Sequence, residues 1–241
     1  MVQYTEWRSI SDGSIISDIP DSELTQTADH IWYHNEGQGT TLGDSVGNKD
    51  GVIDGSSWGS GQGTEDVYLD HDGANDFVDL GDFTYTGSMS AAIWAYPQDD
   101  SNHHLINLFN EDGGPGSVNA QFLIVAVDGE WRVVVAGEDG DVANTFGSVE
   151  LNEWQLLCLD FDGTTATGYQ YSLIEGGLKD STSYSTANEL SVTDDPFFIA
   201  DRPVVSDRHF EGRTDYMTLE FAANAQTAFD DHFAETRRLY E

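Results

Sequence analysis

Residues 122–136 carry the clearest structural signal of this chain: Phe122-Leu123-Ile124-Val125-Ala126-Val127, then Asp128-Gly129, then a second apolar run over 131–136. Asp and Gly both tolerate a positive φ, so two apolar runs joined by Asp-Gly indicate a β-hairpin. The first run is apolar on both strand faces, which is typical of a central strand that is covered on both sides. The hairpin therefore predicts a sheet buried between other layers.

Similar short runs, separated by Gly, Asp and Asn turns, continue on both sides of the hairpin. Further strands are expected over 89–96, 104–109, 154–161, 169–173, 197–200 and 215–221. In the last of these, Met217, Leu219 and Phe221 alternate with polar residues and share one face. Short strands with regular turn signals are typical of an all-β sandwich or jelly roll.

The C-terminus is the one segment with a helical period. Phe229, Phe233, Thr236 and Tyr240 recur at helical spacing, and Thr227 with Asp230 resembles a capping box. We therefore expect a short C-terminal helix that packs on the sandwich. Residues 1–28 show no strong period and are expected to form an arm or docking segment, which leaves 29–241 as one domain.

The charge balance of the chain is extreme. Its 241 residues include 44 Asp and Glu but 9 Lys and Arg, for a formal net charge of −35, and only two lysines, Lys49 and Lys179. The aromatic content of 12% is too high for a disordered acidic tail. Such a domain repels itself in ordinary buffer, whereas molar salt shortens the Debye length to about 3 Å. We interpret the composition as adaptation to high salt, and nucleic acid is excluded as a partner because too few basic residues are present to neutralise phosphates.

The sequence carries no signal for an internal disulfide, a membrane-spanning helix, a signal peptide or a zinc site. The single cysteine, Cys158, excludes an internal disulfide, and its apolar neighbours predict a buried thiol. No segment approaches the roughly 20 apolar residues of a transmembrane helix, and the N-terminus has neither the basic start nor the apolar core of a signal peptide. No Cys/His cluster or His-Glu-x-x-His motif indicates zinc.

The order of motifs from about His30 onward resembles one family. These motifs are Trp32 through Asn48, Gly51-Val52-Ile53-Asp54-Gly55 with Trp58, Asp72-Gly73-Ala74-Asn75-Asp76 through Phe83, Met89 through Pro97, Asn152-Glu153-Trp154 through Gly163, and Phe210 through Asp215. Together they resemble the laminin-G-like jelly-roll domains of the concanavalin A-like lectin/glucanase superfamily. The resemblance implies a two-sheet antiparallel sandwich.

The resemblance also implies a structural Ca²⁺ ion. Members of the family often bind one, and the matching positions here are Asp44, Asn48 and Asp215. Ca²⁺ prefers six to eight oxygen ligands from carboxylates, amides and carbonyls, and these residue types can supply them. The alternative is that Asp44 and Asn48 only cap turns.

Lectin-like binding is the first functional hypothesis, because such sites combine loop-borne polar groups with rigid strand ends. The candidate carbohydrate-binding residues lie in three polar segments: His103, His104, Asn110, Arg202, Arg208 and His209. Arginine is scarce here, so the clustering of Arg202 and Arg208 is informative. The alternative is that both arginines pair with Asp201 and Asp207 as ordinary surface ion pairs.

Enzyme activity is not expected. Laminarinase-like members carry carboxylates at alternate positions of one strand, where two can flank a glycosidic bond, and this chain has no such run. We therefore expect a non-catalytic glycan- or glycoprotein-binding domain. Its placement on a haloarchaeal virus particle, as a spike, turret or tail adhesin, is a hypothesis from the charge and the missing signal peptide.

The hypothesis of a virus particle predicts several partners. They are a glycosylated host surface protein, other virion proteins bound through the arm, and further copies of the chain in a homo-oligomer, with no membrane partner. The alternatives are a purely structural decoration protein without a ligand and, third, a secreted glycan hydrolase.

Overall fold

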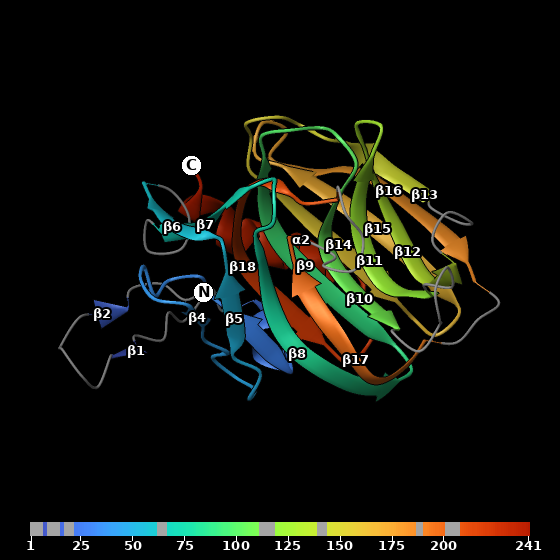
Figure 1. Ribbon diagram of the computed structural model, residues 1–241. Helices are drawn as coiled ribbons and strands as arrows, with labels where there is room; N and C mark the ends of the chain where they lie inside the picture. The colour runs from blue at the N-terminus through green and yellow to red at the C-terminus, as the bar shows by residue number, and fades with distance from the viewer. Residues whose placement is uncertain are drawn as a thin grey trace.

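The computed structural model describes residues 7–8, 15–16, 22–61, 67–110, 119–138, 144–186, 190–200 and 208–241. Two antiparallel sheets form the body of the protein, and Figure 1 shows them as two stacked layers with α2 against one of them. The predicted fold class, an all-β antiparallel sandwich with a short C-terminal helix, is confirmed.

We name the sheets I and II. The strands of sheet I, in spatial order, are β13 (Asn144–Ser148), β12 (Glu130–Glu138), β11 (Asn119–Val127), β10 (His103–Asn110), β17 (Ser191–Ile199), β8 (Phe77–Thr86), β5 (Gly51–Asp54) and β4 (Thr41–Leu42). Those of sheet II are β16 (Gly177–Ser185), β15 (Thr165–Ser172), β14 (Gln155–Phe161), β9 (Met89–Pro97), β18 (Glu211–Glu220), β7 (Val67–Asp72) and β6 (Ser57–Ser60), with β3 (His30–Trp32) also paired to β18. A separate pair joins β1 (Trp7–Arg8) to β2 (Ile15–Ile16).

The predicted hairpin forms as expected. Val127 pairs with Glu130, and the turn residues Asp128 and Gly129 have φ values of 53° and 78°. These angles match the tight turn whose twist suits a hairpin. Strand β11 lies between β10 and β12, and its side chains are buried on both faces. Phe122 and Ile124 belong to the core between the sheets, and Leu123 and Val125 form a smaller buried cluster with Val134.

A second apolar layer lies between sheet II and the C-terminal helix α2 (Gln226–Thr236), which continues into the short helix η3 (Arg237–Leu239). Trp94 of β9 stacks on Tyr240 at 4.1 Å and on Phe233 at 5.7 Å between ring centroids, and its Nε1 donates to Thr236 Oγ1. The predicted helical stripe is confirmed, since its four residues are all buried. The predicted capping box is wrong: the N-cap is Ala225, and no side chain caps the helix. Aromatic packing on sheet II holds the helix instead.

One helix was not expected from the sequence. Helix α1 (Glu23–Thr27) lies within the segment assigned to an arm, and it packs on α2. Leu24 is buried in the layer around Trp94, and Ser22 Oγ lies 2.9 Å from Nδ1 of the buried His232. Five residues are too short to show a helical period in a sequence, which is why tertiary contacts decide this element.

Candidate functional site

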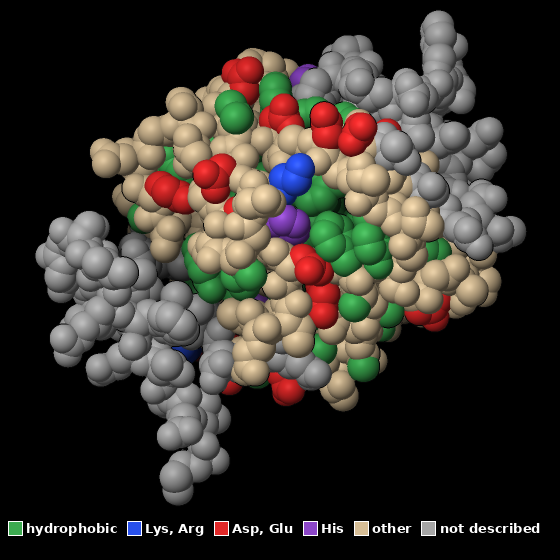
Figure 2. All heavy atoms as spheres, turned by 90° about the horizontal axis from the view of Figure 1, so that it is seen from below, with side chains coloured by type: hydrophobic (Ala, Val, Ile, Leu, Met, Phe, Trp, Pro, Cys, Tyr) green, Lys and Arg blue, Asp and Glu red, His purple; other side chains and the backbone are tan. Residues whose placement is uncertain are grey.

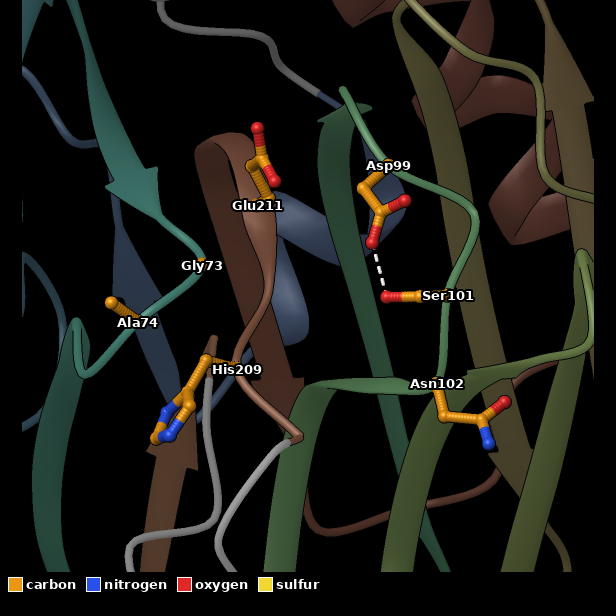
Figure 3. A pocket seen from close by; sticks show the side chains of 7 residues that line it. All are labelled: Gly73, Ala74, Asp99, Ser101, Asn102, His209 and Glu211. Atoms are coloured by element: carbon orange, nitrogen blue, oxygen red, sulfur yellow. Dashed lines mark hydrogen bonds between the residues drawn. The ribbon is translucent and has the colours of Figure 1, made fainter.

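A polar pocket opens at the end of the sandwich where β7 turns into β8, β9 leads to β10, and β18 begins. Its volume is about 300 Å³, and its described lining residues are Gly73, Ala74, Asp99, Ser101, Asn102, His209 and Glu211. Figure 3 shows Gly73 and Ala74 on one side, the loop from Asp99 to Asn102 on the other, and His209 and Glu211 from the start of β18. We call this site the rim pocket.

Strand register brings the walls of the rim pocket together. Strand β18 lies between β7 and β9, where Glu211 pairs with Asp72 and Gly212 pairs with Pro97. The turn after β7 and the loop after β9 therefore flank the first residues of β18. Gly73 adopts a φ of 74°, and a Cβ there would lie 2.8 Å from Cβ of Glu211, so only glycine allows Glu211 to lie against this wall.

The loop wall is tied to its surroundings by backbone groups. The Gln98 N–H donates to the Glu211 carbonyl at 2.9 Å, and the Gly129 N–H donates to the Asp100 carbonyl at 3.1 Å. The Asp128 N–H also donates to Oδ1 of Asn102 at 3.1 Å. The hairpin that identified the fold thus supports one wall of the pocket, and a site held in this way loses little entropy when a ligand binds.

The chemistry of the described lining residues is polar. Asp99 and Glu211 contribute carboxylates, Ser101 a hydroxyl, Asn102 an amide and His209 an imidazole. None of these residues is Trp, Tyr, Phe, Lys or Arg. The pocket can therefore bind a hydroxylated small molecule through hydrogen bonds, without an aromatic ring on which a sugar could stack.

Of the six residues predicted to bind carbohydrate, His209 lines the rim pocket. Arg208 precedes it and connects it to His104, because the Arg208 carbonyl accepts from the His104 N–H and its guanidinium lies 3.3 Å from His104 Nε2. Asn110 is the last residue of β10, and Arg202, with both of its expected partners Asp201 and Asp207, lies outside the described residues.

His103 and His104 are the first residues of β10, so the strand expected over 104–109 is confirmed and begins one residue earlier. His103 is fully buried between the sheets, where its ring packs edge-on against Trp131 and Phe210. Burial lowers the pKa of His103 to about 4, although the nearby charge of Asp99 opposes this shift. His103 is thus a neutral core residue behind the pocket rather than a ligand-binding group.

Asp44, the central residue of the expected calcium site, is surrounded by hydrogen-bond donors. Its Oδ1 accepts from the backbone N–H groups of Ile31, Val46 and Gly47, and its Oδ2 accepts from His30 Nδ1 at 2.6 Å and from the Lys49 N–H at 2.9 Å. Burial raises the pKa of this carboxyl, but these donors outweigh burial and hold its pKa well below the usual range. Its lone pairs are thus already engaged.

The other two expected calcium ligands have separate surroundings. Asp215 is fully buried and accepts from the Tyr216 N–H at 2.7 Å and from the Tyr240 hydroxyl at 3.0 Å, while Asn48 is exposed. In the described part of the chain, no three His, Cys, Asp or Glu side chains are grouped closely enough to hold a metal ion. The donor sets of Asp44 and Asp215 therefore do not fit a Ca²⁺ site built from these residues.

Six residues of the rim pocket were not predicted from the sequence. Gly73, Ala74 and Glu211 stand within motifs that carry the resemblance to the laminin-G-like family, and Asp99, Ser101 and Asn102 stand between the expected strands over 89–96 and 104–109. The sequence does show three polar turn segments at the ends of strands, which is the signal that could have indicated this pocket. Whether these segments lie close together depends on the register of β18, which the sequence does not show.

The surface agrees with the composition. On the face shown in Figure 2, acidic side chains are spread out instead of gathered in one patch, and basic side chains are few. Across the described ranges, no helix combines the length and apolar character needed to cross a bilayer.

Comparison with known proteins extends these observations. Residues 71–221, more than half of the chain, match a laminin-G family model described as the concanavalin A-like lectin/glucanases superfamily. No curated protein sequence matches significantly. Among solved structures, a sialidase of Trypanosoma rangeli in complex with sialic acid is similar with a TM-score of 0.64 at 13% identity, over 98% of this chain and 36% of the sialidase chain.

Two smaller proteins are similar to a comparable degree. Domain 4 of AbnA, a GH43 extracellular arabinanase from Geobacillus stearothermophilus in complex with arabinotriose, has a TM-score of 0.59 at 15% identity, with 85% of this chain and 97% of that chain covered. The receptor-binding domain of botulinum neurotoxin D has a TM-score of 0.63 at 11% identity, and the match covers 88% of this chain and 53% of that chain. At such identities the likeness shows the fold alone, and this chain spans about a third of the sialidase chains.

Proposed function

Because the chain belongs to the concanavalin A-like lectin/glucanases superfamily, we propose that it is a non-catalytic glycan-binding domain, adapted to high salt, whose ligand occupies the rim pocket. The observation that carries this proposal is the pocket itself: a cavity of about 300 Å³ whose described lining residues offer carboxylate, amide, hydroxyl and imidazole groups on a rigid frame. Such groups suit the hydroxyls of one sugar residue.

A binding role fits the carboxyl groups better than a hydrolytic role. A glycosidase acid needs a raised pKa. Among the described carboxyl groups, burial raises the pKa of Asp70, of Asp76 and of Asp160, in the last case to about 6, and none of these three lines the rim pocket. Asp160 accepts from the Asn224 N–H in the loop before α2. The same superfamily contains glucanases, so product analysis on candidate polysaccharides is the direct check, and release of reducing ends would replace this proposal by a hydrolase.

The setting that we propose for this domain is the surface of a haloarchaeal virus particle, where it would recognise a glycosylated host surface. The net charge of −35 with two lysines supports the high-salt part of this proposal. A decoration protein without a ligand is the second candidate, and the absence of an aromatic ring among the described lining residues of the rim pocket favours it.

A glycan array in molar salt, followed by titration of the best ligand, separates these two candidates. Asn102→Asp keeps the oxygen that accepts from the Asp128 N–H but removes the amide donors from the pocket. We expect this variant to bind at least about tenfold more weakly, as the loss of a ligand hydrogen bond predicts. Asn48→Asp, the same change at an exposed position, is the matched control. An array without any ligand would leave decoration as the function.

A further inference from the structure

The hydrogen-bond donors of the rim pocket are largely engaged within the protein. The Ser101 hydroxyl donates to the carboxylate of Asp99, and the Ala74 N–H donates to Oδ1 of Asp72 at 2.8 Å. The oxygen of the Asn102 amide is taken by the Asp128 N–H, which leaves the NH₂ group of Asn102 for a ligand. The imidazole of His209 is the other side chain of the described lining that carries an N–H group.

Acceptors are plentiful in the same pocket. Glu211 is exposed and offers two carboxylate oxygens, Asp99 retains a second oxygen, and Ser101 retains its lone pairs after it has donated. Asp72 pairs with Glu211 across the neighbouring strand and adds a further negative charge beside it. The described lining residues include no Lys or Arg that could balance these charges.

This imbalance restricts the ligand. A sugar hydroxyl or ammonium group can donate to Glu211 and Asp99, whereas a carboxylate or sulfate can only accept and would have to replace water without gaining a charged donor. Because the lost hydrogen bonds act at contact distance, molar salt does not restore them, although it screens the longer-range repulsion.

We infer that the rim pocket selects sugars that are neutral or carry an amino group and rejects sugars that carry a carboxylate or sulfate. This inference rests on the proposed function. Glu211, held against Gly73, is the residue that sets this selectivity. The sialic acid of the similar sialidase complex is therefore the wrong kind of ligand for this pocket.

The test starts from the best ligand on the glycan array in molar salt. That ligand is compared, by calorimetric titration, with two derivatives of it: one with a carboxylate in place of the primary hydroxyl, and one with an amino group in place of a ring hydroxyl. We expect the carboxylated derivative to bind at least about tenfold more weakly than the parent, and the aminated derivative to bind as well or better.

Glu211→Gln then tests the residue. The amide keeps the shape of the side chain, removes its charge and adds donors, so the preference for the aminated over the carboxylated derivative should fall about tenfold. Glu175→Gln, the same change on the exposed turn between β15 and β16, should leave the preference unchanged.

The outcomes are distinguishable. An array on which carboxylated or sulfated glycans bind best overturns this inference while glycan binding stands. An array without ligands removes the proposed function and this inference with it. If Glu211→Gln leaves the preference unchanged, Glu211 does not set the selectivity of the pocket.

Discussion

Asp160 and Asn224 together bind the loop before α2 to three strands. Oδ1 of Asp160 accepts from the Asn224 N–H at 2.7 Å, and the Asn224 amide donates to Ser90 Oγ and to Glu220 Oε2, so the loop before α2 is bound to β14, β9 and β18. Burial raises the pKa of Asp160 to about 6, and the charges of Asp162 and Glu220 add to this shift. The carboxylate form therefore exists here at a cost in stability.

The sign of the pH dependence follows from this shift. The folded pKa of about 6 lies above the unfolded value of about 3.9, so between these pH values the folded state binds more protons and stability falls as the pH rises. Asp160→Asn should remove this slope and stabilise the protein at pH 8 by about 1 to 2 kcal/mol, a figure reduced for partial solvation. Denaturant unfolding at pH 4.5 and pH 8 in molar salt measures it.

Asp162 provides the matched control for that experiment. It accepts from the backbone N–H groups of Thr164 and Thr165, which lower its pKa. Asp162→Asn should therefore give no gain in stability at pH 8. A gain with Asp162→Asn equal to that with Asp160→Asn would attribute both effects to the general loss of negative charge.

Asp44 leads to a prediction about calcium. Its five donors stabilise the carboxylate, so Asp44→Asn should lower the free energy of unfolding by about 2 kcal/mol, the usual range for hydrogen bonds to a charged group. The same donors leave no lone pair for an ion, and the melting temperature of the unaltered chain should be the same in calcium and in EDTA. A clear rise of the melting temperature in calcium, lost in Asp44→Asn, would restore the calcium site.

At the scale of elements, Tyr184 of β16 binds a backbone group of sheet I. Among the described residues, β13 pairs with β12 from Glu130 to Val133, and the Val135 N–H donates to the Tyr184 hydroxyl at 2.7 Å. This contact crosses from sheet II to sheet I, and it gives the Val135 N–H a hydrogen-bond partner near the end of sheet I.

Tyr184→Phe should therefore speed amide hydrogen exchange at Val135 and cost about 1 kcal/mol of stability, as expected for one hydrogen bond. The amide of Val133, which lies within the pairing between β12 and β13, is the internal control. Equal acceleration at both amides would show a general loosening of sheet I instead of a local loss.

At the scale of the whole molecule, the net charge of −35 dominates. Self-repulsion destabilises the compact state in dilute buffer, where the Debye length is about 10 Å, and is largely removed in molar salt. The urea concentration at the unfolding midpoint should therefore rise steeply between 0.1 M and 2 M KCl. Sucrose at equal osmolality is the control, because it does not screen charge, and a midpoint that responds equally to both would argue against adaptation to salt.

The sequence by itself determined the layers of this protein. Alternating apolar residues, the Asp128-Gly129 turn, the buried Cys158 and the stripe on α2 are all local patterns, and each is confirmed. Local patterns suffice here because side-chain period and turn conformation depend on residues within a few positions of one another.

Only the tertiary structure decided the site. The pairing of Glu211 with Asp72 and of Gly212 with Pro97 joins segments more than 100 residues apart, and the direction of His103 into the core depends on which face of β10 meets sheet II. The hydrogen bonds around Asp44 come from four backbone groups and one imidazole that no spacing rule reveals. A shift of one residue in strand register would reverse which side chains face the core and which face the surface, so register, a long-range property, determines the chemistry of the rim pocket.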